Sequence, residues 1–458
     1  MIPLSQYQNQ SIAVLGLARS GLAAARALIA GGAKILAWDD DAKNRTVAAA
    51  ENIPIADLAA VDWTAIKALV LSPGIPHTLP APHPIVMAAK NAGVKIISDI
   101  YLLRHAMPNC KIIGITGTNG KSTTTALIHH IIAGAGIPTQ VGGNLGQAAL
   151  GLQPLADGGI YVLELSSYQL ELIPDCRIEC GVHLNLTPDH LDRHGDMEGY
   201  RQAKKNLFAH QQKGDVAIIG IDDKYSAKTL GELSERRGIK TIPLSIGQKA
   251  EGGIYVMDGI LYDATGGKAE RILDLNTLTS LLGAHNWQNI AAAYGATKFQ
   301  NVSRETICNL ITSFPGLDHR QQNIATIGGI RFINDSKATN PDSAAKALQC
   351  YRPIYWIAGG KPKGDDLDAC APYFGNIQQA FLIGQAAENF ARILGPHLPV
   401  KISGTLRQAV QDAYTQAKMD GMKSPVILLS PACASFDQFR DFEHRGQEFA
   451  EAVHNLAP

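Results

Sequence analysis

The chain has 458 residues, of which 46% are hydrophobic and 18% charged, and its 41 basic side chains balance its 41 acidic ones. This composition is typical of a globular protein of about three domains, without net attraction to polyanions, so nucleic acid and membrane surfaces are not expected partners. The first residues lack the basic and apolar regions of a signal peptide, and the seven cysteines form no Cys-x-x-Cys pair. We therefore expect a cytoplasmic protein with reduced thiols.

The N-terminal segment alternates short apolar strands with helices. Strands are expected at 11–16, 34–38, 68–74 and 94–98, with a helix at 21–30. The turn from Gly16 to Gly21 resembles a dinucleotide-binding turn but lacks the middle glycine of that fingerprint. From this motif alone, a nicotinamide dehydrogenase and a tight turn without a ligand both stay open.

The segment 114–125 is the most informative stretch, because a strand at 111–115 and a helix at 126–132 enclose a glycine-rich loop. Backbone N–H groups at such a helix start can face a phosphate, and Lys121 would supply a point charge. Ser122 or Thr123 would offer a hydroxyl to Mg²⁺. Ile115 stands where the standard pattern has a glycine. The alternative is a glycine-rich turn that Ser122 caps.

Two further strands end near this loop. The strand 160–164 ends in Glu164, an acidic residue that is well placed to hold Mg²⁺. The strand 180–185 leads to three histidines, for which no recognised zinc spacing is complete. We expect His183 to be a packed core residue and His190 to contact Mg²⁺ or phosphate. The segment 200–208 reads as a helix with a solvated basic face.

The chain from 216 to 282 is less regular. Asp258-Gly259 between two alternating apolar pairs predicts a hairpin. A helix follows from 285, with Asn286 and Asn289 on one face because of their i,i+3 spacing. Surface capping by Asn286 is the simpler explanation of that residue.

A third alternating region starts at the linker 314–320. Strands are expected at 330–334, 353–358, 380–383 and 426–430. The loops 335–343, 359–364 and 430–439 combine basic, hydroxyl and acidic groups that suit a small charged substrate. Capping of the next helix by Asn340 and Asp342, with Pro341 in its first turn, is the alternative for the first loop.

Six motifs in this order resemble the Mur ligase family over nearly the whole chain. They are Gly-Thr-Asn-Gly-Lys-Ser-Thr at 117–123, Leu-Glu-Leu-Ser-Ser-Tyr-Gln at 163–169, Leu-Thr-Pro-Asp-His-Leu-Asp-Arg-His at 186–194, His-Asn-Trp-Gln-Asn at 285–289, Asn-Asp-Ser-Lys-Ala-Thr-Asn-Pro-Asp at 334–342 and Ser-Pro-Ala-Cys-Ala-Ser-Phe-Asp-Gln-Phe at 430–439. Within the family, the last two loops are similar to those of the members that add D-glutamate.

The resemblance implies an α/β protein of three domains. Residues 1–99 would form a Rossmann-like domain for the UDP substrate, 100–316 a central P-loop ATPase-like domain with a mostly parallel sheet, and 317–458 a Rossmann-like domain for the amino acid and ATP. A monomer in the bacterial cytoplasm would use ATP and Mg²⁺ to join D-glutamate to UDP-N-acetylmuramoyl-L-alanine (UDP-MurNAc-L-Ala) through an acyl phosphate, a step of peptidoglycan precursor synthesis.

The resemblance also implies site residues. Catalytic roles fall to Lys121, His190, Lys204 and Lys337. ATP would contact Gly117, Thr118, Asn119, Gly120, Lys121, Ser122, Thr123, Asn286, Asn289, Arg320 and Asp335. One or two Mg²⁺ ions would be bound by Ser122, Glu164, His190 and Lys204, the last as a carbamate. The UDP substrate would contact Ser20, Asp39, Gly74, Asn144, Ser166 and His190, and D-glutamate would contact Thr339, Lys363, Ser435, Phe436 and Phe442.

Two positions depart from the family pattern, since 39–41 is acidic where a cation is common and Phe436 replaces an aliphatic residue. Three alternatives remain beside this interpretation, of which the nicotinamide dehydrogenase suggested by the first strand–helix–strand unit is disfavoured by the missing middle glycine. A sibling Mur ligase or a folylpolyglutamate synthetase would share the phosphate loop but add another amino acid. A noncatalytic nucleotide-binding protein would bind ATP without releasing phosphate.

Overall fold

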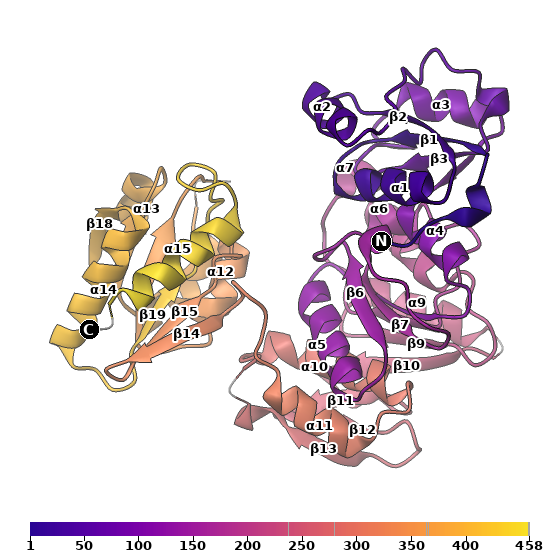
Figure 1. Cartoon of the computed structure of the whole chain (residues 1–458). Helices are drawn as coiled ribbons and strands as arrows, with labels where there is room; N and C mark the ends of the chain where they lie inside the picture. Colours follow the sequence, from indigo (N-terminus) through magenta and orange to yellow (C-terminus); the bar gives the residue numbers. More distant parts are fainter. Residues whose placement is uncertain (237, 279, 363, 365, 457–458) are drawn as a thin grey trace. The chain divides into compact units, whose positions relative to one another are not determined.

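The computed structural model describes residues 1–236, 238–278, 280–362, 364 and 366–456. The chain divides into two compact units, the first formed by 1–277 and 286–314 and the second by 278–285 and 315–458. Figure 1 follows the chain through both units. Three mostly parallel sheets with helices against them confirm the expected α/β class.

The first sheet has the order β2-β1-β3-β4, and all its pairs are parallel. Alternate residues of β1 enter different cores: Val14 packs with Leu28 of α1, and Leu15 packs with Val86 of α3. β1 lies between β2 and β3, so the chain reverses its direction of winding there and leaves a crevice at the strand ends. The elements are β1 (Ser11–Leu15), α1 (Arg19–Ala30), β2 (Lys34–Trp38), α2 (Ala42–Ala50), β3 (Ala68–Leu71), α3 (Pro84–Asn91), β4 (Lys95–Ile97) and α4 (Asp99–Ala106).

The second sheet of the first unit has nine strands, in the order β13-β12-β11-β10-β9-β8-β5-β7-β6. It is parallel from β11 to β6, while β12 and β13 are antiparallel. Asp258 and Gly259 both have positive φ, as a two-residue hairpin requires, which confirms the predicted turn. The strands are β5 (Lys111–Thr116), β6 (Thr139–Gly143), β7 (Ile160–Glu164), β8 (Cys180–His183), β9 (Val216–Gly220), β10 (Lys240–Ser245), β11 (Ile254–Met257), β12 (Ile260–Asp263) and β13 (Glu270–Asp274).

Helices cover both faces of this sheet. Gly295 of α10 lies against Ile218 of β9, whereas the neighbouring Ile219 belongs to the opposite face with Phe208. The helices are α5 (Lys121–Gly134), α6 (Ser167–Leu170), α7 (Leu191–His194), α8 (Met197–Lys205), α9 (Lys224–Ser234), α10 (Ala284–Lys298) and α11 (Arg304–Ser313).

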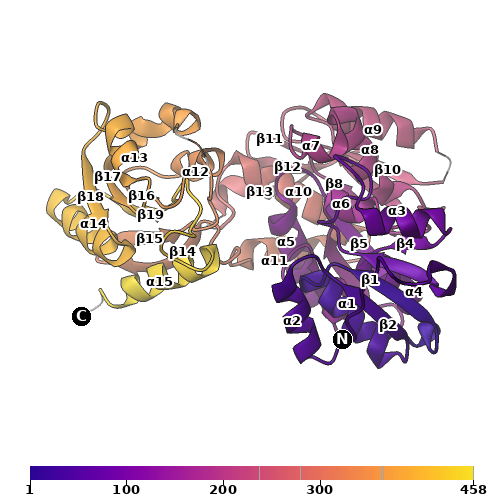
Figure 2. The same ribbon diagram turned by 90° about the horizontal axis from the view of Figure 1, so that it is seen from above.

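The second unit contains a six-stranded sheet, in the order β14-β15-β19-β16-β17-β18, in which only the pair β14–β15 is antiparallel. Helices α12 and α13 pack on one face, and α14 and α15 on the other (Figure 2). The elements are β14 (Gln322–Ile327), β15 (Ile330–Asn334), α12 (Pro341–Leu348), β16 (Ile354–Gly359), β17 (Ile377–Ile383), α13 (Ala387–Leu394), β18 (Val400–Gly404), α14 (Leu406–Asp420), β19 (Val426–Leu429) and α15 (Phe442–His454). Short 3-10 helices occur at Ser5–Tyr7, Trp63–Ala65, Ala149–Gly151, Asn206–Phe208, Leu275–Thr277 and Asp368–Asn376.

All seven cysteines carry free thiols. Burial raises the pKa of Cys176, Cys180 and Cys370 to about 12. Across the described residues, no helix combines the length and the apolar character needed to cross a bilayer.

Candidate functional site

The phosphate loop joins β5 to α5 as the sequence predicts. Gly117 and Gly120 have φ of 147° and 85°, values that favour glycine. A Cβ atom on Gly120 would also come within 2.2 Å of Asn289 Oδ1. α5 begins after Gly120 without a side-chain cap, so the expectation of a turn capped by Ser122 is wrong. The first backbone N–H groups of α5 remain suited to an anion.

Lys121 folds back across the loop that precedes it. Its Nζ donates to the carbonyl oxygens of Gly117 at 2.9 Å and Thr118 at 2.8 Å. Asn185, two residues after the end of β8, braces the same loop, because its Oδ1 accepts a hydrogen bond from Asn119 N at 2.9 Å. The lysine charge is therefore held at the mouth of a rigid loop.

Helix α10 packs directly against the loop. Asn289 Nδ2 donates to Asn286 Oδ1 at 2.9 Å, and Thr124 Oγ1 donates to Asn289 Oδ1 at 3.2 Å. The shared face predicted from the i,i+3 spacing is thus confirmed. Asn286 is the third residue of α10 and only 9% exposed, so the explanation as a surface cap is wrong.

Glu164 ends β7 beside the loop and is 3% exposed. Its Oε1 accepts a hydrogen bond from Asn144 Nδ2 at 2.7 Å, while Oε2 is buried without a hydrogen-bond partner among the described residues. A buried carboxylate oxygen without a partner is costly unless a cation lies against it. The Glu164 carboxylate therefore fits a Mg²⁺ ligand.

Lys204 is 1% exposed, so the expectation that this side chain is solvated is wrong. Its Nζ donates to Thr116 Oγ1 at 3.2 Å and to Gly117 O at 3.0 Å. Burial lowers the pKa of this amine well below its usual value, and the charge of Lys121 lowers it further. The neighbouring Lys205 instead pairs with Glu232, because the polar face of α8 turns toward solvent at that position.

The three histidines have separate environments. His190 starts α7 with a positive φ of 54°, and its ring centroid lies 5.1 Å from that of Tyr168. His194 is buried, and its Nε2 lies 2.9 Å from Ser167 Oγ. His183 is 1% exposed, which confirms it as a core residue, and burial lowers its pKa to about 3. Within the described ranges no group of three or more His, Cys, Asp or Glu side chains is arranged to hold a metal.

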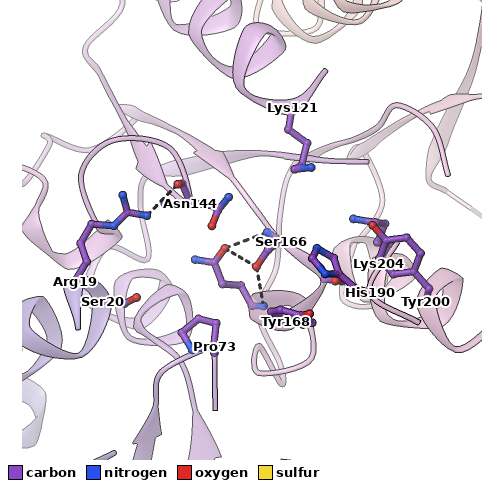
Figure 3. A pocket seen from close by; sticks show the side chains of 14 residues that line it. Arg19, Ser20, Pro73, Lys121, Asn144, Ser166, Tyr168, His190, Tyr200 and Lys204 are labelled. Atoms are coloured by element: carbon purple, nitrogen blue, oxygen red, sulfur yellow. Dashed lines mark hydrogen bonds between the residues drawn. The ribbon is translucent and has the colours of Figure 1, made fainter. Parts of the chain in front are cut away.

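A cavity of about 390 Å³ connects the phosphate loop with the crevice of the first sheet (Figure 3). It brings together Ser20, Gly74, Asn144 and Ser166 with Lys121, His190 and Lys204. The lining residues have no carboxylate among them and include four basic side chains. The full lining is Arg19, Ser20, Pro73, Gly74, Lys121, Gly143, Asn144, Ser166, Ser167, Tyr168, Gln169, His190, Tyr200 and Lys204.

Asp39 does not line this cavity. Its Oδ2 accepts a hydrogen bond from Leu17 N at 2.6 Å and so holds the turn after β1. The acidic loop 39–41 contains no basic residue. Arg45 of α2 supplies a cation next to it, and the Arg45 guanidinium lies 4.5 Å from the Trp38 ring centroid. The sequence offers little signal for Arg45, because the residue follows the loop by one helical turn.

In the second unit, several of the predicted D-glutamate and ATP residues follow the adjacent strands β15 and β19. Asp335 is buried, and its Oδ2 accepts a hydrogen bond from Ser430 Oγ at 2.7 Å. Lys337 Nζ lies 3.7 Å from the ring centroid of Phe442 at the start of α15. Ser435 is buried and Phe436 is 68% exposed. Lys363 lies outside the described residues.

Arg445 holds the two loops of this edge together, although no sequence motif marks it. The side chain is fully buried in α15. Its Nε donates to Ser336 Oγ at 2.9 Å, and its Nη2 donates to the carbonyls of Ser336 at 2.8 Å and Cys433 at 3.1 Å. Asn340 caps α12 through Ser343 N at 2.8 Å, as the capping alternative predicts.

Two family models and several full-length relatives match this chain. The model for the Mur ligase middle domain matches residues 115–297, and the model for the Mur ligase glutamate ligase domain matches residues 319–433. The UDP-N-acetylmuramoylalanine–D-glutamate ligase of Rhodospirillum rubrum is 49% identical and covers 100% of this chain and 97% of its own length. The chain belongs to the Mur ligase family. A Mur ligase of Caulobacter vibrioides with the same name is 48% identical, over 100% of this chain and 98% of that one.

Solved Mur ligases share the fold. MurF from Acinetobacter baumannii superposes with a TM-score of 0.62 at 18% identity, covering 92% of this chain and 91% of that one. MurC from Thermotoga maritima superposes with a TM-score of 0.59 at 15% identity, covering 98% of this chain and 100% of that one. The middle-domain model begins within β5 and ends within α10, so it spans the phosphate loop, Glu164 and Lys204 of this Mur ligase.

Asp335→Asn is expected to stabilise this Mur ligase progressively as pH rises from 4 to 7. Burial raises the pKa of Asp335 from 3.8 to about 7, so the folded state holds a proton that the unfolded state releases. The free energy of unfolding of the protein with Asp335 is then highest below the pKa that this group has in the unfolded state. As pH rises from that value to the pKa in the folded state, the free energy of unfolding falls by about 1.4 kcal/mol for each pH unit. Asparagine does not titrate. Thermal unfolding of the second unit at pH 4 to 9 measures the difference, and a gap between the two proteins that does not vary with pH would contradict it.

Proposed function

We propose that this chain is an ATP-dependent ligase that joins D-glutamate to UDP-MurNAc-L-Ala in peptidoglycan precursor synthesis, with ADP and phosphate as the other products. The observation that carries the proposal is the cavity that links the phosphate loop to the crevice of the first sheet. Relatives named for this reaction, about half identical over their whole length, support the choice of substrates.

The chemistry requires charge neutralisation rather than a protein nucleophile. A carboxylate oxygen of the alanyl group attacks the γ-phosphorus of ATP, and ADP leaves, which produces an acyl phosphate. The amine of D-glutamate then attacks the acyl carbon, and the resulting tetrahedral intermediate expels phosphate while the nitrogen loses a proton. Basic side chains and helix N-termini placed where negative charge gathers lower both barriers.

ATP would lie along the phosphate loop of residues 117–123. Backbone N–H groups at the start of α5 would face its phosphates, and Lys121 would exchange its two carbonyl contacts for the β- and γ-phosphate oxygens. Asn286 and Asn289 would contact the nucleotide from α10. Arg320 and Asp335, which belong to the second unit, would also contact the nucleotide.

Mg²⁺ would be held by Glu164 Oε2, with Ser122 and His190 as further ligands. When bound, the ion supplies positive charge to the phosphate oxygens and to the carboxylate under attack. Asn144 orients Glu164 for this role by its hydrogen bond to the other carboxylate oxygen.

A carbamate on Lys204 would complete the set of metal ligands. Because burial lowers the pKa of the amine, a neutral nucleophile is available for CO₂. The nitrogen lone pair forms the C–N bond, a C=O electron pair moves onto oxygen, and the nitrogen proton passes to water. This change places a negative charge beside Lys121, and it adds a second acidic group to Glu164 at a site where no three His, Cys, Asp or Glu side chains of the described residues are arranged to hold a metal.

D-glutamate would bind at the edge formed by β15 and β19. Its two carboxylates need cationic and hydroxyl partners, which Lys337, Thr339 and Ser435 can offer. Phe436 and Phe442 would border this site, as would Lys363. We further propose three domains with bounds 1–99, 100–316 and 317–458, a monomer as the working form, and a location in the bacterial cytoplasm.

An assay of phosphate release distinguishes the D-glutamate ligase from a sibling enzyme and from a noncatalytic nucleotide-binding protein. The assay contains ATP, Mg²⁺, UDP-MurNAc-L-Ala and D-glutamate, with each component omitted in turn and with L-lysine or diaminopimelate offered in place of D-glutamate. We expect release only with the complete set and D-glutamate. Equal release without D-glutamate contradicts the ligase proposal, and a preference for another amino acid favours a sibling enzyme. ATP binding without any release favours a noncatalytic protein.

A further inference from the structure

The cavity of the first unit is lined by basic groups from two different sheets. Lys121 and Lys204 belong to the central nine-stranded sheet and its helices, near the proposed ATP site. Arg19 reaches the same cavity from the four-stranded sheet and its helices, beside Ser20 (Figure 3), and Gly74 is a further lining residue. Since no carboxylate is among the described lining residues, the lining suits a ligand with negative charge along its length.

Arg19 is the first residue of α1, which has no side-chain cap at its N-terminus. Its Nη1 donates to Gly146 O at 2.9 Å and its Nη2 donates to Asn144 O at 3.0 Å. These acceptors are neutral main-chain oxygens. Burial raises the pKa of the Asp99 carboxyl to about 6 and the charge of Arg19 partly offsets this rise, but no ion pair between the two side chains forms among the described residues. The guanidinium is thus oriented by the loop after β6 while its charge remains available to an anion.

We propose that Arg19 is a specificity-determining residue that binds the diphosphate of the UDP-sugar substrate. The inference rests on the proposed function, because it assigns a binding partner to one part of that substrate. A guanidinium has five N–H donors, of which the two carbonyls use two, so it can hold the loop and still donate to phosphate oxygens. The adjacent N–H groups at the start of α1 would face the same anion.

The position of Arg19 distinguishes this role from the binding of other parts of the substrate. Ser20 and Gly74 lie at the crevice between β1 and β3, where a nucleoside is expected. Figure 3 shows Asn144 and Ser166 between Arg19 and Lys121. A diphosphate connects the nucleoside and the sugar of a UDP-sugar, and Arg19 is next to Ser20 in the chain while its guanidinium donates to Asn144 O.

The test compares UDP, UMP and uridine as ligands of the full-length protein and of Arg19→Met and Arg19→Lys. Calorimetry measures each dissociation constant. We expect Arg19→Met to weaken UDP binding by about tenfold or more, because a charge-assisted hydrogen bond is lost, and to leave uridine binding unchanged. Arg19→Lys keeps the charge without the planar fork, so an intermediate affinity for UDP is expected. In turnover, KM for UDP-MurNAc-L-Ala should rise more than kcat falls.

Arg26→Met is the matched control, because Arg26 belongs to the same helix but pairs with Glu51 away from the cavity. It should bind UDP as the unaltered protein does. If Arg19→Met weakened UDP and uridine binding equally, Arg19 would merely hold the loop, and the inference would be overturned. Unchanged UDP binding in Arg19→Met would overturn it as well. Failure of the unaltered protein to bind UDP at all would instead count against the proposed function.

Discussion

Replacement of Lys204 by alanine is expected to abolish phosphate release, with a loss of about a thousandfold or more in kcat. Alanine cannot carry a carbamate, so the proposed metal site would keep a single buried carboxylate, that of Glu164. The change removes the part of the lysine side chain beyond Cβ, which has as many heavy atoms as acetate. Acetate or propionate should therefore restore part of the activity, whereas methylammonium, which restores only an amine, should not.

Lys205→Ala provides the control for this experiment. Lys205 is the next residue of α8, but it pairs with Glu232 rather than lying beside the phosphate loop. Its replacement should leave turnover and its Mg²⁺ dependence close to those of the unaltered protein. Full activity of Lys204→Ala without added carboxylate would exclude a carbamate as a required ligand.

Lys121→Ala is expected to reduce kcat/KM by about a thousandfold. The change removes the positive charge that would stabilise the γ-phosphate during its transfer to the substrate carboxylate. The loop itself should keep its shape, because Asn185 and Asn289 brace it independently of the lysine. We therefore expect a small change in melting temperature beside a large loss of turnover. ATP binding by calorimetry and phosphate release together measure the two effects.

Lys111→Ala supplies the comparison, because Lys111 starts the same strand and contacts Gln300 at the opposite end from the loop. That variant should retain activity. Turnover of Lys121→Ala within a few fold of the unaltered protein would show that the lysine does not act on the transferring phosphate.

The parallel strands were the part of the fold most accessible from sequence. β1, β5, β7, β8 and β19 are continuous apolar runs because they are buried on both faces, and each ends in glycine or polar residues. β6 escaped prediction because its sequence, Thr-Gln-Val-Gly-Gly, has a single strongly apolar residue. α14 and α15 also escaped, since alanines and charged residues give a weak periodic signal there.

Site residues could be predicted where a motif defines the chemistry, as for Lys121 and Glu164. Lys204 was different: from residue type alone, a lysine in a basic helix reads as solvated, and its burial depends on how α8 packs against the loop. For a similar reason, Arg19 and Arg445 could not be identified as site residues from the sequence. Their partners are main-chain carbonyls distant in sequence, and carbonyls leave no residue-type pattern to read.

The thiols have a practical consequence for measuring motion. A thiolate is the form that reacts with maleimides, and a pKa near 12 leaves only about one buried thiol in 10⁵ ionised at pH 7. Cys176, Cys180 and Cys370 should thus remain unlabelled while the protein is folded. A cysteine introduced on the surface of each unit could carry a fluorescent dye without removal of these native residues. Energy transfer between the two dyes would then measure the distance between the labelled positions before and after each substrate is added.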